Sequence, residues 1–417
     1  MVRDGACWEI RLHRLPRREP ITSARRCHAP SRSGREDNTN TDKGEDMPEA
    51  HIAGYGSALP WPITTERFLE VDRDARRLHG QDERISETVH RIARSTGIRT
   101  RHFGSPCWLP EDERPADVED IFTAHRFDPP GNLRARVWQS LAPTLAIDSA
   151  RDAIAHWGGS VSDITHVVTT CTSGWSEPGI SAALIHALGL SLDTQKQELN
   201  FNGCFCGATC LRVARDFVRA GDARAVLVVA VETASVQYDP LATDISSLIA
   251  TSLFADGAAA FIIAPEGEWV YRTSGMSLVP DTEQHLRMAP DLESDRPTYR
   301  MFLHRQIGAR LASYFRDERG AELLASMLDR SGHPPALAVH PGGPSILESV
   351  ANVFVDHGWP QDAMQPSIDT LYDTGNLGAA ALLFVMARQL PHLEADHLGT
   401  FAFGPGVTVE WALLERS

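Results

Sequence analysis

Apolar positions along the chain follow two kinds of pattern. Short, nearly continuous apolar runs predict strands that are covered on both faces, and the clearest are residues 223–232 (ARAVLVVAVE) and 258–264 (AAAFIIA). Longer stretches with apolar residues three or four positions apart predict amphipathic helices, as in residues 141–157. The two patterns alternate along most of the chain, which favours an α/β protein.

The second part of the chain repeats the order of elements in the first. Strands are predicted at residues 51–59, 164–172, 223–232, 258–264, 269–278, 336–340, 399–403 and 407–414. Helices are predicted within 65–95 and at 141–157, 180–188, 204–221, 305–330, 345–358 and 378–390, and residues 104–132 read as Pro- and acid-rich loops. We therefore expect two related halves, residues 47–267 and 268–417.

Residues 1–46 differ from the rest. They contain ten basic and eight acidic residues and no sustained apolar period, which predicts a disordered tail. The acidic residues count against a transit peptide. Because Met47 directly precedes the first predicted strand, an alternative is that translation begins there and that the tail is an artefact of start-site choice.

Charge and cysteine usage narrow the class of protein. The net charge of −15 argues against nucleic acid or an anionic membrane as the main partner. No apolar run approaches the ~18 residues of a membrane span. Seven irregularly placed cysteines, without a secretory apolar segment, favour reduced thiols in the cytoplasm.

The stretch 199–221 (LNFNGCFCGATCLRVARDFVRAG) carries the first candidate for chemistry. A turn at Asn202-Gly203 leads into a mostly apolar helix that begins at or near Cys204. A helix N-terminus favours thiolate over thiol, which suits a nucleophile. The alternative is that Cys204 is a small buried apolar residue. Cys206 is expected to pack, and the CxCxxxC spacing is not expected to bind a metal, because one helical turn cannot converge three thiols.

Two further motifs place a reactive side chain at a junction before a helix. His340 ends a predicted strand in VHPGGPSIL (339–347), and Asn376 lies at a turn in YDTGNLGAAALL (372–383). Alone, such a histidine is usually structural and such an asparagine is usually a helix cap. Together, a thiolate, an imidazole and an amide can accept an acyl group and stabilise the enolate of a malonyl thioester.

These motifs resemble one family in order and spacing. The segments GCFCGATCLRVARDFVRAGDARAVLVVAVE, VHPGGPSIL, GNLGAAALLF and AFGPGVTVEWALL resemble the chalcone-synthase-like, or type III, polyketide synthases of the thiolase superfamily, here a bacterial-type member. The resemblance implies a thiolase-like duplicated αβαβα five-layer fold and a homodimer. It also implies an acyltransferase that extends an acyl-CoA starter with malonyl-CoA and cyclises the chain to a pyrone, resorcinol or other phenolic product. No cofactor or metal is implied beyond the CoA thioester substrates.

The resemblance assigns roles to individual positions. It makes Cys204 the acylated nucleophile. It implies that His340 keeps Cys204 ionised and, with Asn376, binds the malonyl thioester carbonyl. Phe254 matches a gatekeeping phenylalanine, and Met301 is the candidate for a second gatekeeper. The expected pocket residues are Thr172, Trp175, Glu177, Ala234, Gln237 and Ala250. Arg91 and Arg94 are the candidates for contacts with the CoA phosphates.

Rival functions remain. An initiating 3-ketoacyl synthase that uses acyl carrier protein has a similar fold and the same three reactive residue types, although HPGGP favours the type III class. Thiolases need a second cysteine and hydroxymethylglutaryl-CoA synthases a glutamate, and no good candidate for either is evident. A catalytically silent partner subunit would be expected to have lost Cys204, His340 or Asn376, and all three are present.

Overall fold

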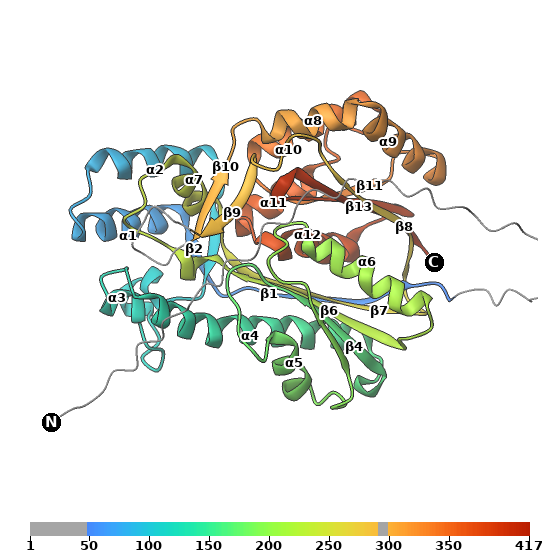
Figure 1. Cartoon of the computed structure of the whole chain (residues 1–417), viewed down its shortest axis with the longest axis horizontal. Helices are drawn as coiled ribbons and strands as arrows, with labels where there is room; N and C mark the ends of the chain where they lie inside the picture. The colour runs from blue at the N-terminus through green and yellow to red at the C-terminus, as the bar shows by residue number, and fades with distance from the viewer. Residues whose placement is uncertain (1–47, 291–298) are drawn as a thin grey trace, which may run out of the picture. The chain divides into compact units, whose positions relative to one another are not determined.

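The computed structural model describes residues 48–290 and 299–417 (Figure 1). The predicted tail, residues 1–46, lies outside the described residues. Within them no helix is long and apolar enough to cross a lipid bilayer.

A mixed sheet of nine strands forms the centre of the described part, in the order β11-β12-β13-β8-β1-β7-β6-β4-β5. The strands are β1 His51–Ala58, β4 Ile164–Thr170, β5 Gln195–Glu198, β6 Ala225–Thr233, β7 Asp256–Ala264, β8 Trp269–Leu278, β11 Ala336–Val339, β12 His397–Gly404 and β13 Thr408–Arg416. The predicted strands thus all form, within a few residues of their expected ends.

The sheet consists of two runs of strands with the same order and directions. In the first run, β1 pairs antiparallel with β7, β7 antiparallel with β6, and β6 parallel with β4. In the second run, β8, β13, β12 and β11 repeat this sequence of directions. The runs meet where β1 pairs with β8 over two residues only, His51 with Val270 and Ile52 with Trp269. This repetition is the duplication that the order of elements predicts.

Helices cover the strands in layers. The helices α6 (Cys206–Arg219) and α12 (Ala381–Gln389) lie between the two runs and contact both (Figure 1). The helices α4 (Gly131–Trp157) and α5 (Ile180–Leu188) cover the other face of the first run, and α8 (Ile307–Arg316) and α10 (Pro344–Asp356) pack on the second.

The strand β6 shows why the layers form. Its even-numbered residues Val226, Val228 and Ala230 pack in the core beside α6 and α12, whereas Leu227, Val229 and Val231 pack beneath α4 and α5. Successive side chains of a strand point to opposite faces, so an uninterrupted apolar run is stable only between two helical layers.

Some predicted bounds were wrong. The helix predicted at 305–330 is two helices, α8 and α9 (Glu318–Ser331), because the backbone of Asp317 is extended and its side chain accepts a hydrogen bond from the Gly320 N–H. The helix predicted from residue 141 begins at Gly131 and contains Pro143. Residues 104–132 also include the short helix α3 (Ile121–Ala124).

A group of smaller elements lies beside the end of the sheet that carries the motifs. It includes α1 Thr65–Leu78, α2 Glu83–Ser95, α7 Ile245–Leu253, α11 Gln365–Thr374, the pair β2 Trp61–Thr64 and β3 Thr100–Phe103, and the pair β9 Leu286–Pro290 and β10 Tyr299–Leu303. The helix α11 and the β9–β10 pair were not predicted. In this group α7 contacts both α2 and β10.

Candidate active site

The candidate residues of the first half gather at one edge of the sheet. The parallel strands β4, β5 and β6 all point toward this edge, so that Thr172, Cys204 and Ala234 follow their carboxyl ends. The antiparallel strand β7 begins here, with Asp256 paired to Thr233. Loops at the carboxyl ends of parallel strands are where ligands usually bind in α/β proteins.

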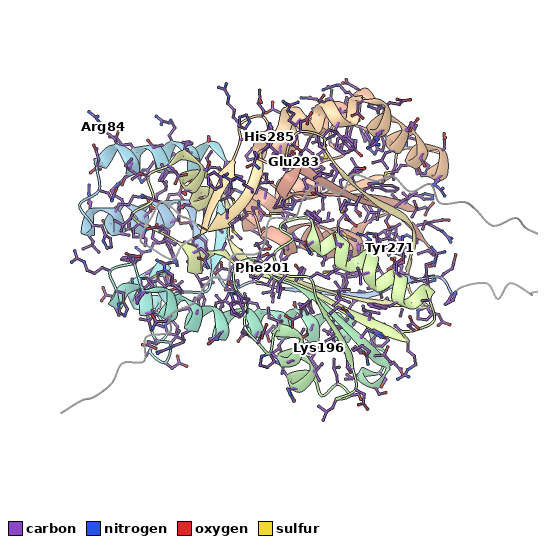
Figure 2. The ribbon with its side chains drawn as sticks, in the orientation of Figure 1. Arg84, Lys196, Phe201, Tyr271, Glu283 and His285 are labelled. Atoms are coloured by element: carbon purple, nitrogen blue, oxygen red, sulfur yellow. The ribbon has the colours of Figure 1, made fainter. Side chains whose placement is uncertain are left out.

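Cys204 lies in a tight turn just before α6. The Cys206 N–H donates to the Gly203 carbonyl at 3.0 Å, and Gly203 has a φ of +90°. A β-carbon on Gly203 would lie 2.3 Å from Cδ of Pro405, so only glycine permits the contact between this turn and the loop after β12. Cys204 itself is half-buried, and the exposed Phe201 precedes it (Figure 2).

The electrostatics at Cys204 differ from the expectation for a helix N-terminus. Burial and the nearby Glu232 carboxylate raise the pKa of Cys204 to about 12, against a smaller opposing effect of its own backbone N–H. Desolvation and a like charge both disfavour the thiolate. The free protein therefore holds Cys204 as a thiol, and a nucleophilic role needs a base to accept its proton.

His340 follows β11 and has the properties of such a base. Its backbone N–H donates to the Phe401 carbonyl at 2.8 Å, which extends the pairing of β11 with β12. Its side chain is 2% exposed, and burial lowers the pKa of His340 to about 4. Within the described residues Nδ1 has no hydrogen-bond partner. The imidazole is thus neutral near pH 7 and can accept a proton or donate a hydrogen bond.

Asn376 is held in one orientation. Its backbone N–H donates to the Leu253 carbonyl at 2.8 Å, and its own carbonyl accepts from Ala255 at 3.0 Å, so it pairs with Phe254 in a short bridge. Its Oδ1 accepts from the Gly378 N–H at 2.9 Å, and its Nδ2 donates to the Gly342 carbonyl at 3.2 Å. A side-chain amide carries two N–H groups, so one bond to Gly342 leaves a second donor for a ligand.

Close contacts join the turns that carry the three residues. Besides the contact of Gly203 with Pro405, a β-carbon on Gly207 in α6 would lie 2.3 Å from the carbonyl oxygen of Ala379, three residues after Asn376. The hydrogen bond from Asn376 to Gly342 connects that turn to the loop after His340. The structure thus ties the predicted nucleophile, imidazole and amide into one assembly of turns.

Sequence reasoning missed two buried carboxylates at this edge. Glu232 accepts hydrogen bonds from the N–H groups of Thr172 at 3.1 Å, Ser173 at 2.9 Å and Ala379 at 3.4 Å, and burial raises its pKa. It therefore links the pocket loop after β4 to the turn after Asn376. The signal was a single acid at the end of an otherwise apolar run, AVLVVAVE.

Asp256 is the second of these carboxylates. It accepts from the Ser235 N–H at 2.8 Å, the Ser235 hydroxyl at 2.5 Å and the Gly104 N–H at 2.8 Å, and burial raises the pKa of Asp256 to about 6. It fixes the start of the 3-10 turn Ala234–Gln237. The corresponding signal was the lone acid in LFADGAAAF.

The predicted pocket residues fall into two groups. Thr172 and Ala234 are half-buried at the edge just described, and Gln237 joins them because its Nε2 donates to the Ser173 carbonyl at 2.8 Å. Trp175 and Glu177 are instead exposed, Trp175 by 60%.

The predicted gatekeepers lie on neighbouring elements. Phe254 follows α7, which also carries Ala250, and the Phe254 N–H donates to the Ala250 carbonyl at 3.0 Å. Met301 lies on β10 opposite Met288, and this pair of strands is joined to α7 by a hydrogen bond from the Leu303 N–H to the Ser246 hydroxyl.

The predicted CoA contacts, Arg91 and Arg94, are exposed on α2, the helix that packs against α7. In the part of the chain that the structure describes, neither makes an ion pair. Cys206 and Cys210 are buried in α6, with Cys206 Sγ 3.1 Å from the Leu199 carbonyl oxygen, and the described residues contain no group of three or more potential metal ligands. Both side chains pack in the hydrophobic core.

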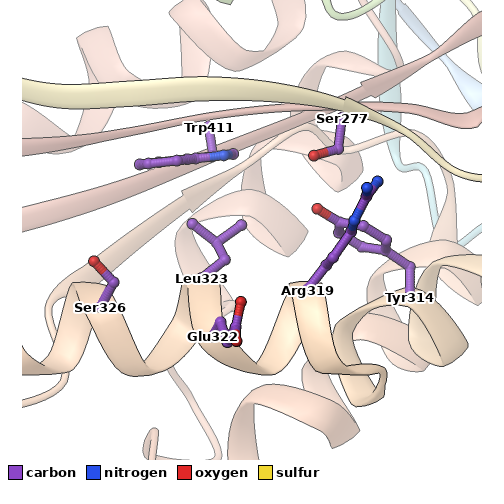
Figure 3. A pocket seen from close by; sticks show the side chains of 7 residues that line it. All are labelled: Ser277, Tyr314, Arg319, Glu322, Leu323, Ser326 and Trp411. Carbon is purple, nitrogen blue, oxygen red and sulfur yellow. The ribbon is translucent and has the colours of Figure 1, made fainter.

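A groove elsewhere on the protein is separate from this site. It has a volume of about 320 Å³ and lies between α9 and the strands β8 and β13 (Figure 3). The indole of Trp411, which covers Gly275 of the next strand, borders it. Its lining residues are Ser277, Tyr314, Arg319, Glu322, Leu323, Ser326 and Trp411, and none is among the predicted site residues.

Comparison with known families matches both parts of the chain. Residues 40–267 match the N-terminal domain of chalcone and stilbene synthases, and residues 336–417 match the C-terminal domain. Together these matches span well over half of the sequence.

Individual relatives agree with the family match. Bisdemethoxycurcumin synthase from rice, Oryza sativa subsp. japonica, is 30% identical over 366 residues, which cover 80% of this chain and 84% of the relative. Type III polyketide synthase B from Arabidopsis thaliana is 26% identical, over 89% of this chain and 95% of the relative.

Among solved structures, the C-terminal type III polyketide synthase domain of Steely1 from Dictyostelium superposes with a TM-score of 0.76. It is 26% identical, and the match covers 88% of this chain and 99% of that domain. The predicted thiolase-like fold is thereby confirmed.

Proposed function

The chain belongs to the chalcone and stilbene synthase family and is a type III polyketide synthase, and we propose which of its residues act in each step of the reaction. Cys204 accepts an acyl group from an acyl-CoA starter, and malonyl-CoA extends it by decarboxylative condensation. The extended chain then cyclises to a pyrone, resorcinol or other phenolic product. The observation that carries the proposal is the set of contacts that ties the turns of Cys204, His340 and Asn376 together.

Loading starts from the thiol. Neutral His340 accepts the proton of Cys204 as the sulfur attacks the thioester carbonyl of the starter. A carbon–sulfur bond forms to Cys204, the bond to the CoA sulfur breaks, and the departing CoA thiolate takes the proton back from His340. The raised pKa of Cys204 disfavours a thiolate, and the lowered pKa of His340 disfavours an imidazolium. Because an ion pair of the two is costly before the attack, proton transfer and attack are expected to be coupled.

Extension uses hydrogen-bond donors at the same place. His340 and the free Nδ2 hydrogen of Asn376 donate to the thioester oxygen of malonyl-CoA, where negative charge develops as carbon dioxide leaves. The resulting carbanion attacks the acyl carbonyl on Cys204, forming a carbon–carbon bond and releasing the thiolate. The lengthened chain is then a CoA thioester that can reload Cys204.

The remaining assignments concern substrate binding. We assign Phe254 and Met301 to the mouth of the pocket. Its walls are assigned to Thr172, Trp175, Glu177, Ala234, Gln237 and Ala250. Arg91 and Arg94, exposed on α2, would contact the CoA phosphates. The chemistry requires no cofactor or metal beyond the CoA thioesters.

A homodimer is part of the proposal. Among the residues that the structure describes, the strand β5 ends the sheet and pairs with β4 alone. The exposed apolar side chains of Trp175, Leu192 and Phe201 lie in the segments that flank α5 and β5. An unpaired edge strand bordered by exposed apolar residues is a favourable place for a second copy. Light scattering should give twice the chain mass of 45.8 kDa, and a monomer would contradict this part. The cysteine usage supports a cytoplasmic location.

The test of function is a substrate panel. Purified protein is incubated with acyl-CoAs, from short to long and aromatic, with and without malonyl-CoA, and products are identified by mass spectrometry. Malonyl-dependent products that disappear in Cys204→Ala and persist in Cys210→Ala, a matched change at a cysteine buried in α6, are expected. Products formed only from acyl carrier protein thioesters would favour the 3-ketoacyl synthase, and no product from either would favour a silent subunit.

A further inference from the structure

The segment that connects the 3-10 turn Ala234–Gln237 to α7 has pocket residues at both ends. Ala234 and Gln237 precede it, and Ala250 and Phe254 follow it. Residues 238–244 form no helix or strand, although Tyr238 is buried. A connection of this kind relies on side chains to satisfy its backbone groups and to fix its course.

Arg134 of α4 binds the first part of this segment. Its Nη1 donates to the carbonyl oxygens of Val236 at 2.8 Å and Tyr238 at 2.7 Å. Its Nη2 pairs with Asp128 at 3.1 Å, and the side chain is 12% exposed. One guanidinium thus holds two alternate carbonyls while a carboxylate fixes its own position.

Arg76 of α1 binds the second part in the same way. Its Nη1 donates to the carbonyl oxygens of Pro240 at 3.2 Å and Ala242 at 2.8 Å. Its Nε lies 3.0 Å from the carboxylate of Asp72, and Arg76 and Asp72 are fully buried. The Tyr238 hydroxyl donates to the same carboxylate at 2.9 Å, so the segment is attached to Asp72 directly as well.

The two arginines therefore hold four carbonyls in alternation, those of residues 236, 238, 240 and 242. Each guanidinium donates to both of its carbonyls from one nitrogen, Nη1, and pairs with a carboxylate through another. A lysine has only one nitrogen and cannot reproduce this arrangement. Loss of either guanidinium leaves two at least partly buried carbonyls without these donors, which disfavours the observed course of the segment. The segment is then expected to shift or to fluctuate.

We propose that Arg76 and Arg134 are positioning residues that set the depth of the pocket, and thereby the number of malonyl units added before the chain is released. This inference rests on the proposed function. Neither arginine touches Cys204, His340 or Asn376 in the described structure; each acts through the 236–242 segment on the pocket side chains at its ends. A displacement of ~1 Å at a pocket wall can change rates by up to about 10²-fold, which is ample to alter where extension stops.

The test compares product ratios rather than total activity. Arg134→Lys, Arg134→Gln and Arg76→Lys are assayed with one starter that the wild type extends, and the ratio of shorter to longer products is measured. Measured at the start of the reaction, before released CoA thioesters reload the enzyme, this ratio does not depend on the fraction of active enzyme, so simple destabilisation leaves it unchanged. Leu324→Ala, buried in α9 away from the segment, serves as a destabilised control, and Arg316→Gln, at an exposed ion pair with Asp356, as a charge control.

Hydrogen exchange supplies the second readout. We expect faster exchange in peptides covering 236–244 in the arginine variants, together with a change of about threefold or more in product ratio, and neither in the controls. Unchanged exchange would show that the arginines do not hold the segment. Faster exchange with an unchanged ratio would show that the segment does not set chain length. If Arg76→Lys does not fold, the less buried Arg134 variants decide.

Failure of the proposed function is distinguishable from failure of this inference. A wild type that forms no malonyl-dependent product overturns the proposed function and, with it, the effect on chain length. In that case the exchange measurement still decides whether the two arginines position the segment.

Discussion

Nδ2 of Asn376 donates a hydrogen bond to the carbonyl oxygen of Gly342, two residues after His340, at 3.2 Å. This bond connects the loop after β11 to the turn before α12, so the two groups proposed to bind the malonyl thioester cannot move independently. Oδ1 of the same side chain accepts a hydrogen bond from the Gly378 N–H, so the Nδ2 end of the amide is the one that points toward Gly342.

Replacing Asn376 by aspartate should separate loading from extension. A carboxylate cannot donate to the Gly342 carbonyl or to a thioester oxygen, so we expect malonyl-dependent product formation to fall by about 10²–10³-fold. Transfer of the starter to Cys204 should persist, because Asn376 takes no part in it. Mass spectrometry of the protein and of the products measures the two steps. Extension at the wild-type rate would rule out this role for Asn376.

His340 should make the protein sensitive to acid. Its pKa is lowered from 6.5 to about 4, so the unfolded chain binds a proton more readily than the folded one between these pH values. Stability from this group is present above pH 6.5 and is lost as the pH falls toward 4, by up to about 3 kcal/mol. Denaturant unfolding at pH 7 and pH 5 should show a smaller loss for His340→Gln than for the wild type. An equal loss would mean that the imidazole is not held neutral by burial.

Glu232 should control the ionisation of Cys204. Burial and the Glu232 charge together raise the pKa of that thiol to about 12, so Glu232→Gln should lower it and shift the pH midpoint of iodoacetamide alkylation downward. The alkylated Cys204 peptide is quantified by mass spectrometry, and Cys107 serves as an internal reference, because it is buried and Glu232 is not among the groups that shift the pKa of its thiol. An unchanged midpoint would show that burial alone sets the pKa.

The contact between α6 and the Asn376 turn should tolerate no side chain at Gly207. A β-carbon there would lie 2.3 Å from the Ala379 carbonyl oxygen, so Gly207→Ala is expected to cost about 1–3 kcal/mol in unfolding free energy and to reduce activity. Gly131→Ala is the matched control, because its β-carbon meets nothing within 4 Å and lies in the first turn of α4. Equal melting temperatures for the two variants would contradict the close contact.

Local signals account for the elements that sequence analysis placed well. The predicted bounds 180–188 and 269–278 are those of α5 and β8, because Gly179 and Gly189 flank α5 directly and Gly267 and Pro280 lie one residue beyond the ends of β8. The break at Asp317 could not be read in the same way: the apolar period continues from α8 into α9, and only the backbone of Asp317 shows that its side chain caps a new helix.

In the candidate site, too, local motifs identify some residues, and only the fold identifies the others. Cys204, His340 and Asn376 could be named because each lies in a motif at a junction between elements. Glu232 and Asp256 could not, because a lone acid beside an apolar strand gives no indication of what it binds until the fold brings Thr172, Ser173, Ser235 and Gly104 to it. The thiol form of Cys204 was missed for the same reason, since its burial and the proximity of Glu232 are tertiary properties.

The most direct test of the account is the intact mass of the protein after incubation with the starter acyl-CoA alone. One acyl group should add to the wild type and to Cys210→Ala, peptide mapping should place it on Cys204, and Cys204→Ala should gain no mass. An acyl group on another residue, or the same mass gain in Cys204→Ala, would contradict the assignment of Cys204 as the nucleophile.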